Sequence, residues 1–249
     1  MARPGRELGV ILGIDTATRS AAIGLAGAGQ TFAEDHLEGS GLRTRGLLGA
    51  IDGLLRGAGA ATSDLEGVAV GVGPGSFTGL RVGIAAAQGI ALGLGIPLVG
   101  VATLECVARN APAEAHTVCV LVDAGRGEVF VGKFVNAGAA GLVMSGSARV
   151  LTPGQAAESI PVGAIVLGDG WLRYRGAFDR LLGATIHTLD EERSRIRGTV
   201  VATLGATRLA EAPAHAGTLI EPVYVRAPDA KLYDPPPEVR AGASQASRG

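Results

Sequence analysis

The chain has 249 residues, of which 47% are hydrophobic and 18% charged, and its formal net charge is −1 at pH 7. This length supports one large domain or two modest lobes with an ample core. The near-neutral charge excludes a broad basic surface for nucleic acid or anionic membrane. The two cysteines, Cys106 and Cys119, show no metal-ligand spacing, and we expect both to be reduced in a cytoplasmic chain.

The opening of the chain predicts three strands followed by a helix. Apolar runs at 10–14, 21–25 and 31–37, separated by a polar turn and a glycine-containing turn, predict an antiparallel meander. Leucine and isoleucine at helical spacing then predict an amphipathic helix over residues 42–58.

The stretch from residue 68 to residue 101 organises the rest of the chain. It opens with an apolar strand over 68–72, which glycine and proline interrupt. Ser76 has the side chain of a helix N-cap, so a helix is expected over 77–94. A strand over 98–101 follows, and the unit predicts a crossover between two parallel strands.

The helix over 77–94 carries small residues every four positions, which places them on one face. They are Gly75, Gly79, Gly83, Ala87, Ala91 and Gly95. A glycine inside a helix costs roughly 1 kcal/mol relative to alanine, so a helix that retains several is expected to gain close packing. Two partners for this face stay open: the protein's own sheet, or a helix of another chain.

The apolar run over 82–101 has the length of a membrane span. It contains Gln88, Pro97 and many glycines, and Arg81 precedes it directly, so we expect no span. The N-terminal residues are charged and no cleavable apolar segment follows them, so we expect no secretory leader and a cytoplasmic location.

A second lobe is expected in the later part of the chain. Its strands over 117–122 and 128–135 repeat the plan of the opening, with an apolar strand, an aspartate, a polar turn bearing an arginine and a second strand. We therefore expect lobes over 1–110 and 111–233, followed by a disordered tail over 234–249. The other expected elements are a short helix over 103–110, a strand over 142–150, a helix over 152–159, a strand over 164–167, helices over 171–182 and 199–212, and a terminal strand or extended clip over 220–225.

The glycine-rich turn before the long helix matches none of three catalytic or nucleotide-binding motifs. It lacks the lysine of a P-loop, the spacing of a dinucleotide fingerprint and the flanking glycines of a nucleophile elbow. Ser76 is accordingly interpreted as an N-cap rather than a nucleophile. The histidines are scattered, without a metal-binding pair. The sequence therefore predicts no catalytic residue and no metal site.

Asp15 and Asp123 end apolar strands at the start of the two expected lobes. In an actin-like or sugar-kinase-like fold, a carboxylate at this place would hold Mg²⁺ for phosphoryl transfer, and Thr16 would stand beside a phosphate. The alternative is that each aspartate ends a turn through local hydrogen bonds. If the two lobes share one plan, Asp15 and Asp123 should lie on opposite sides of one cleft. Asp15, Thr16 and Asp123 are therefore candidates for a vestigial nucleotide or metal cleft.

The runs GVGPGSFTGLRVGIAAAQGIA, GIDTATRSAAIGL, VDAGRGEVF, GDG and PVYVR together resemble the bacterial TsaB family, also called YeaZ. The match spans residues 12–226. The resemblance implies an α/β fold, the two-lobed actin-like or hexokinase-like (ASKHA) ATPase fold, degenerate and without catalysis. It implies an accessory dimerisation subunit, not an enzyme, in the machinery that makes N6-threonylcarbamoyladenosine (t6A) at position 37 of tRNAs that read ANN codons.

The resemblance also implies the partners. TsaD, the catalytic transferase, is the expected partner; the ATPase TsaE joins the assembled complex, and tRNA is contacted through that complex. For the chain without TsaD, a homodimer and a monomer both stay open. The chain is expected to have no cofactor of its own, so ATP or ADP and Mg²⁺ belong to the partner subunits or their interface. The implied interface residues are Leu47, Leu48, Ile51, Leu55, Ser76, Phe77, Gly79, Leu80, Arg81, Gly83 and Ala87.

Two rival functions remain beside the scaffold role. One is a small-molecule phosphotransferase of the actin-like fold that uses Asp15. The other is a peptidase, the older label of the family, against which the missing metal ligands argue. The chain also departs from the family at the start of the first long helix, where members usually carry a histidine and this sequence has Arg43 or a neighbour. A polar role of that histidine therefore does not carry over.

Overall fold

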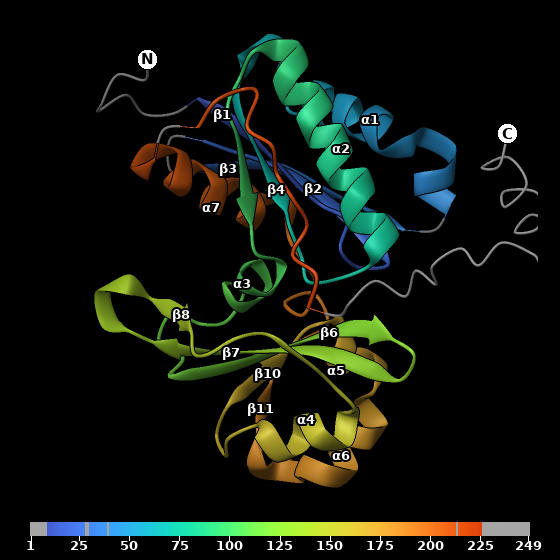
Figure 1. Cartoon of the computed structure of the whole chain (residues 1–249), viewed down its shortest axis with the longest axis vertical. Coiled ribbons are helices and arrows are strands. Elements are labelled where there is room, and N and C mark those ends of the chain that lie inside the picture. Colours follow the sequence, from blue (N-terminus) through green and yellow to red (C-terminus); the bar gives the residue numbers. More distant parts are fainter. Residues whose placement is uncertain (1–8, 28–29, 39, 213, 226–249) are drawn as a thin grey trace, which may run out of the picture.

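The computed structural model describes residues 9–27, 30–38, 40–212 and 214–225. Two sheets, each with its own helices, lie one above the other, and the short helix α3 (Thr103–Ala108) lies between them (Figure 1). The expected disordered tail at 234–249 and the side chain of Arg43 lie outside what the structure describes.

The first sheet has five strands in the order β3-β2-β1-β4-β5. They are β1 (Val10–Asp15), β2 (Ser20–Gly27), β3 (Gln30–Glu38), β4 (Leu65–Gly71) and β5 (Leu98–Val101). The first three strands pair antiparallel, whereas β4 pairs parallel with both β1 and β5. The predicted meander and the predicted parallel strand–helix–strand unit are both confirmed.

Two long helices cover one face of this sheet, α1 (Ser40–Gly57) and α2 (Phe77–Leu94). The ends of α2 are those that the sequence predicts. The Ser76 hydroxyl accepts a hydrogen bond from the Gly79 N–H at 3.2 Å, and Gly95 ends the helix with a left-handed φ of 68°.

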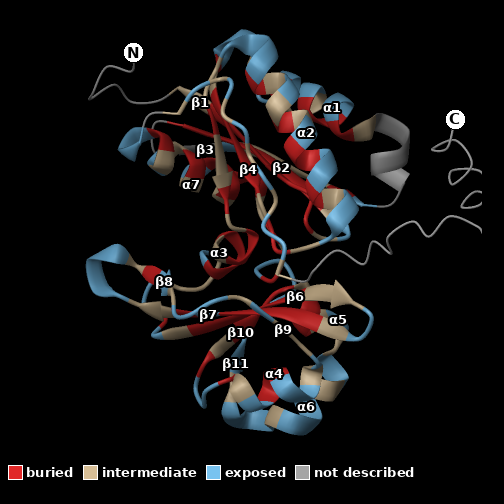
Figure 2. Cartoon of the chain, viewed as in Figure 1, coloured by how far each residue is buried: buried red, intermediate tan, exposed pale blue. Residues whose placement is uncertain are grey.

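Side chains of β1 alternate between two cores. Ile11 packs in the core shared with α3 and the second sheet, and the adjacent Leu12 packs in the core under α1 and α2; both are fully buried. This alternation follows from the twofold period of a strand. Figure 2 shows the buried residues concentrated in the strands of both sheets and on the inner sides of the helices.

The second sheet has six strands, of which five follow the order β11-β10-β6-β7-β8, and β9 pairs with β7. They are β6 (Thr117–Gly125), β7 (Glu128–Asn136), β8 (Leu142–Met144), β9 (Arg149–Leu151), β10 (Ile165–Leu167) and β11 (His187–Thr188). Its helices are α4 (Pro153–Ser159), α5 (Asp169–Arg173) and α6 (Arg175–Leu182). Short 3₁₀ turns occupy Thr62–Asp64, Gly138–Ala140 and Gly183–Thr185.

Two expected elements of this lobe are each divided. The strand expected over 142–150 is two short strands, β8 and β9, which contact different parts of β7. The helix expected over 171–182 is α5 followed by α6, with a break at Tyr174 that lets Trp171 and Phe178 pack together at 5.3 Å between ring centroids.

The last helix, α7 (Gly198–Glu211), packs on the first sheet, although we expected the whole of 111–233 in the second lobe. Backbone contact positions it there. A Cβ at Gly13 would lie 2.3 Å from the Gly198 oxygen, and one at Gly24 would lie 2.2 Å from the Thr199 nitrogen. Glycines on β1 and β2 therefore leave the space in which the first turn of α7 rests on the sheet.

The small residues of α2 face the protein's own β1–β2 turn. A Cβ at Gly79 would lie 2.0 Å from the Thr16 carbonyl oxygen, and one at Gly83 would lie 2.2 Å from the Thr16 hydroxyl. Ala87 and Ala91, further along the same face, are buried in the core that includes the strand residues of the first sheet. Of the two partners left open for this face, the structure therefore has the intramolecular one. Among the described residues, one helix, α2, is long and apolar enough to cross a membrane, judged by length and composition alone.

The chain returns across α2 in an extended segment, residues 214–225, here called the C-terminal strap. The Val223 N–H donates to the Val72 carbonyl at 2.8 Å, and the Gln88 side-chain amide donates to the Ile220 carbonyl at 3.3 Å. Of the two predictions for 220–225, the extended clip is correct and the terminal strand is wrong.

Candidate functional sites: the interlobe cleft and the α2 surface

Asp15 ends β1 and is completely buried. Its Oδ1 accepts the Ala17 N–H at 2.7 Å, and its Oδ2 accepts the Thr103 hydroxyl at 2.8 Å. The same hydroxyl accepts the Gly73 N–H at 3.1 Å, so hydrogen bonds join the end of β1, the start of α3 and the glycine-rich turn after β4. A Cβ at Gly71 would lie 2.0 Å from Asp15 Oδ2, which closes the remaining side.

Burial dominates the electrostatics of this carboxylate. The pKa of Asp15 is raised to about 6: burial raises it most, the hydrogen bonds from Ala17 and Thr103 lower it, and the negative charge of Asp169 raises it. A raised pKa can mark a functional acid, but here the group is enclosed by its own lobe rather than exposed in a cleft.

The residues around Asp15 do not fit the Mg²⁺ that an actin-like fold would place there. Mg²⁺ keeps several waters and demands octahedral geometry, whereas both oxygens of Asp15 are engaged and no surface of the residue is accessible. Thr16 is also buried, and its hydroxyl donates to the Gly79 carbonyl at 2.7 Å rather than facing a phosphate. The geometry of Thr16 therefore does not favour the candidate phosphate role, and the turn-forming interpretation of Asp15 fits its geometry.

Asp123 has a different setting, in the second sheet. Its Oδ1 accepts the Gly125 N–H at 3.0 Å and the Tyr174 hydroxyl at 3.3 Å. Its Oδ2 lies 3.4 Å from a terminal nitrogen of Arg173 and 3.7 Å from Nε of Arg19, which comes from the first lobe. Asp123 therefore takes part in an ion pair that bridges the two lobes.

A pocket of about 530 Å³ opens at this bridge. Its lining residues come from both lobes and are Arg19, Ser20, Glu38, Asp123, Asp169, Leu172, Arg173, Glu191 and Arg195. Asp15 and Asp123 do stand in separate sheets, but only Asp123 lines the pocket, because the β1–β2 turn encloses Asp15. Among the described residues, no group of three or more His, Cys, Asp or Glu side chains could hold a metal ion.

Asp169 is a cleft residue that sequence reasoning missed. Its Oδ1 accepts the Asp123 N–H at 3.0 Å, and burial raises its pKa, with the Asp123 charge acting in the same direction. Its position in the sequence could have indicated it, because Asp169 comes directly after the apolar strand β10 and Gly168. Gly168 has a φ of 117°, a conformation that favours glycine.

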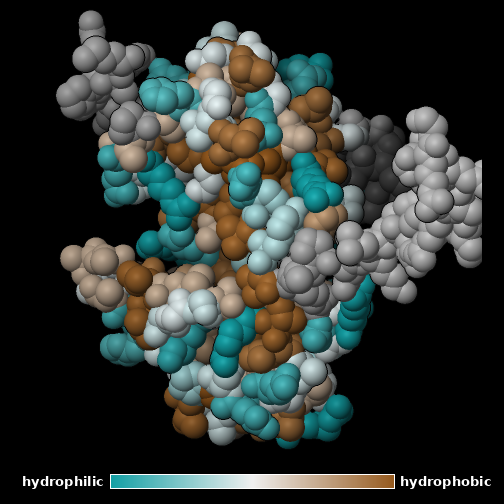
Figure 3. All heavy atoms as spheres, viewed as in Figure 1, coloured by the Kyte–Doolittle hydropathy of each residue, from teal (hydrophilic) through white to brown (hydrophobic). Residues whose placement is uncertain are grey.

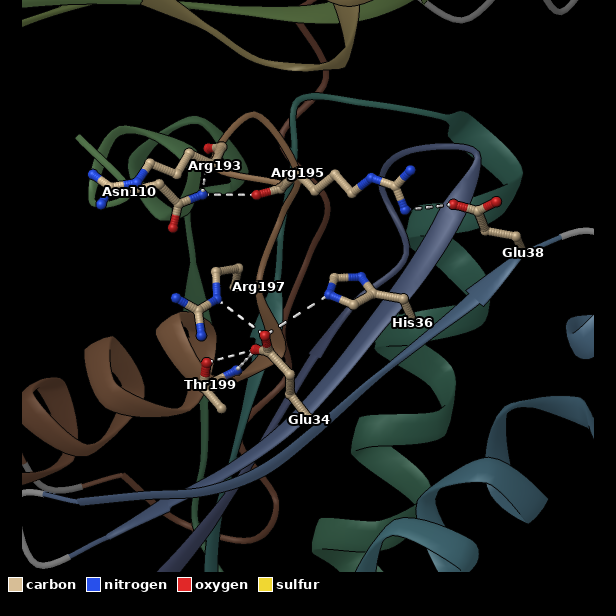
Figure 4. Close-up of polar contacts among 8 residues, drawn as sticks. All are labelled: Glu34, His36, Glu38, Asn110, Arg193, Arg195, Arg197 and Thr199. Carbon is tan, nitrogen blue, oxygen red and sulfur yellow. Dashed lines mark hydrogen bonds and ion pairs between the residues drawn. The ribbon is translucent and has the colours of Figure 1, made fainter. Parts of the chain in front are cut away.

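The sequence analysis also did not predict a network of hydrogen bonds and ion pairs near the junction of the lobes (Figure 4). Glu34 on β3 accepts hydrogen bonds from Arg197 Nε at 3.0 Å and from the Thr199 hydroxyl at 2.6 Å. It also accepts the Thr199 N–H at 3.4 Å, so a carboxylate from another element caps α7. Partial burial raises the pKa of Glu34, but the bonds from Thr199 and Arg197 outweigh it and leave that pKa below its ordinary value.

The same network ties together the two segments that cross between the lobes. The Asn110 side-chain amide donates to the carbonyl of Arg193 at 3.0 Å and to that of Arg195 at 2.7 Å. The Arg195 guanidinium then reaches Glu38 on β3 at 2.9 Å. Alternating arginines over 193–197 were the sequence signal, but Glu38 and Glu34, the partners of Arg195 and Arg197, lie about 160 residues earlier, and only the fold brings these pairs together.

The implied interface residues divide into buried and exposed sets. The buried ones are Leu47, Ile51, Leu55, Leu80, Gly83 and Ala87, all of which pack inside the first lobe. Helical periodicity identified an apolar face of α1 correctly, and in the single chain that face is the inner one. Ser76, Arg81, Leu48 (60% exposed) and Phe77 (41% exposed) are on the surface, and Gly79 lies partly buried against Thr16.

The outer side of α2 is unusually apolar and small. Val82, Leu92 and Leu94 are exposed, and nothing lies within 4 Å of a Cβ placed at Gly89 or Gly93. Figure 3 shows apolar side chains gathered on this part of the molecular surface. Exposed apolar surface of this kind is typical of a contact with another protein.

Comparisons with known proteins show which proteins this chain is similar to. The family model described as "TsaD: tRNA N6-adenosine threonylcarbamoyltransferase" matches residues 43–160. The tRNA threonylcarbamoyladenosine biosynthesis protein TsaB of Escherichia coli (strain K12) is 39% identical over 122 residues, which are 48% of this chain and 52% of that protein. The matched part therefore spans about half the length of this curated relative.

Solved structures extend the likeness to most of the chain. A crystal structure from Pseudomonas aeruginosa, described as similar to peptidase YeaZ, has a TM-score of 0.71 and 27% identity, over 88% of this chain and all of that one. Component A of (R)-2-hydroxyglutaryl-CoA dehydratase from Acidaminococcus fermentans has a TM-score of 0.52 over 82% of this chain and 99% of that one. At 14% identity, the second likeness concerns the fold alone.

The two sheets, the meander followed by a parallel crossover and the helix between the lobes define an α/β protein of the actin-like (ASKHA) fold class. The close agreement with YeaZ over nearly the whole chain and the matches to curated TsaB proteins narrow the assignment. The chain is thus similar to the TsaB (YeaZ) proteins, over about half of its length in sequence and over most of it in structure.

Proposed function

We propose that the chain is a non-catalytic scaffold subunit that pairs with TsaD and supports t6A synthesis at position 37 of tRNAs reading ANN codons. The observation that carries the proposal is the enclosure of Asp15. Both oxygens of Asp15, the carboxylate expected at the phosphoryl-transfer position of the first lobe, accept hydrogen bonds from Ala17 and Thr103, and the residue has no accessible surface. The position therefore serves the fold rather than chemistry.

The surface of α2 supports the pairing. Phe77, Val82 and Leu92 are all more than 40% exposed on one helix of an otherwise well-packed lobe. An exposed apolar helix is stabilised when a partner covers it. We therefore revise the interface to the exposed residues of α2 and Leu48 of α1, with the buried leucines supporting them from behind.

The remaining parts of the proposal come from the family. TsaE joins the assembled complex, tRNA is contacted through the complex, and the chain dimerises on itself when TsaD is absent. ATP or ADP and Mg²⁺ belong to the partner subunits or the interface, in accord with the poor fit around Asp15. The location is cytoplasmic.

A phosphotransferase is the second candidate, because the pocket at the lobe junction lies where the two lobes of an actin-like fold meet. Reconstitution separates the two functions. The full chain is assayed alone for ATP hydrolysis, and with TsaD and the other t6A components for tRNA modification. The scaffold predicts negligible ATPase activity, a stable complex with TsaD and modification that requires the chain. ATP hydrolysis by the pure chain that is lost in Asp15→Asn would instead establish the phosphotransferase.

A further inference from the structure

Arg81 is held on the surface of α2 by two aromatic rings. Its guanidinium carbon lies 3.7 Å from the centroid of the Phe77 ring, one helical turn earlier. Its Nε donates a hydrogen bond of 3.2 Å to the hydroxyl of Tyr224 in the C-terminal strap. The two rings also pack on each other, with centroids 5.2 Å apart. Residues 143 positions apart therefore immobilise an exposed arginine.

The guanidinium keeps donors free. Stacking occupies its face and the bond to Tyr224 uses Nε, and no hydrogen bond from the two terminal nitrogens to another described residue is present. Arg195 and Arg197 each have a carboxylate oxygen within 3.0 Å, whereas Arg81 has none within 4.0 Å among the residues that the structure describes. An arginine fixed in place without a partner has already lost the side-chain entropy that binding would otherwise cost.

The surroundings of Arg81 are apolar. Phe77 is 41% exposed, Val82 48%, Val223 51% and Tyr224 38%. We call these four residues together with Arg81 the Arg81 patch. A fixed cation within exposed aromatic and aliphatic side chains has the composition of a protein–protein hot spot, where arginine, tyrosine and other aromatic residues are enriched.

We propose that the Arg81 patch binds a carboxylate side chain that a protein partner presents among apolar residues. This inference rests on the proposed pairing with TsaD and names the chemistry of one contact within it. The free edge of the guanidinium matches a carboxylate in a two-pronged geometry, and the apolar rim excludes water from the pair.

The patch suits neither of two other occupants. Nucleic acid binding draws on several phosphate contacts, and this patch offers one cation. A second copy packed α2 against α2 would offer Arg81 no carboxylate from that helix, because α2 contains no Asp or Glu. The partner therefore supplies the acid.

The test measures binding of the full chain to purified TsaD from the same organism by calorimetry, at about 50 mM and about 300 mM NaCl. Arg81→Gln removes the charge, and Arg81→Lys keeps the charge but loses the planar stack and the paired donors. Tyr224→Phe keeps the ring and loses only the hydrogen bond that orients Nε. Arg180→Gln, at an exposed arginine on α6 in the other lobe, is the matched control, and thermal unfolding is measured for every variant.

We expect Arg81→Gln and Arg81→Lys each to weaken binding about tenfold or more, Tyr224→Phe to weaken it less, and Arg180→Gln to leave it unchanged. The salt dependence of binding should be smaller for Arg81→Gln than for the native chain. Folded Arg81 variants that bind TsaD at native strength overturn the inference and leave the scaffold function standing. Loss of self-association or of tRNA binding, with TsaD binding unchanged, overturns it in favour of a second copy or RNA. Absence of any binding by the native chain removes the proposed function and the inference together.

Discussion

The hydroxyl of Thr103 donates a hydrogen bond of 2.8 Å to Oδ2 of Asp15, across 88 positions of sequence and between the first strand and the helix that joins the lobes. It also accepts the Gly73 N–H. This one side chain thus satisfies a buried carboxylate and a buried backbone donor at once. The place where an actin-like enzyme would hold its metal is here a structural joint.

Replacing Thr103 by valine should destabilise the fold by about 1–3 kcal/mol, because it leaves a buried acceptor and a buried N–H without partners while keeping the side-chain shape. Urea denaturation measures the loss. Thr203→Val is the matched control, since the Thr203 hydroxyl only bonds the Thr199 carbonyl of its own helix at 2.8 Å, and it should change stability little. Equal stability of the two variants would show that the Asp15 joint contributes nothing.

The pH dependence of stability should carry a signature of Asp15. Its pKa is raised from 3.8 to about 6 in the folded chain, chiefly by burial, so the folded state binds the proton more tightly than the unfolded state. Stability from this group is therefore greatest below about pH 4 and falls as pH rises to about 6, by on the order of 3 kcal/mol. The measurement is the difference between native and Asp15→Asn stability across that range, which cancels the other carboxylates. A difference that does not vary with pH contradicts the prediction.

Glu34 should act in the opposite sense. Burial raises its pKa, the bonds from Thr199 and Arg197 outweigh that effect, and the folded pKa lies below 4.5. Its contribution is present above the unfolded pKa and is lost as pH falls through the folded pKa. Glu34→Gln should destabilise the chain by about 1–3 kcal/mol at pH 7, since α7 loses its cap and Arg197 its partner. Glu158→Gln, at an exposed position on α4, is the control and should be nearly neutral.

Two glycines of α2 should respond in opposite ways to alanine. At Gly83 a Cβ would lie 2.2 Å from the Thr16 hydroxyl, so Gly83→Ala should destabilise the fold by about 1–3 kcal/mol through overpacking. At Gly89 nothing lies within 4 Å, so Gly89→Ala should stabilise the helix by up to about 1 kcal/mol. Thermal unfolding of both variants decides the matter. A stable Gly83→Ala protein with impaired TsaD binding would instead return Gly83 to the interface.

Local sequence determined most of the elements of this protein and several of their ends. Ser76 caps α2 and Gly95 ends it in the left-handed conformation, as their side chains predict, because a cap needs only neighbouring backbone groups. The resemblance to the TsaB (YeaZ) proteins was also visible in the sequence, since the motifs that carry it are contiguous runs. The stacking of Arg81 on Phe77, four positions earlier in the same helix, follows from local sequence, but the hydrogen bond from Arg81 to Tyr224 does not.

Only the tertiary structure decided which faces are inside and which lobe each helix joins. Glycines at 79 and 83 and at 89 and 93 give α2 two faces of small residues, and periodicity cannot tell them apart. The β1–β2 turn covers the first pair and leaves the second open. In the same way, α7 follows the second lobe in sequence but packs on the first sheet, where Gly13, Gly24 and the Glu34 carboxylate receive it. These choices depend on contacts between residues far apart in the chain, which local pattern does not encode.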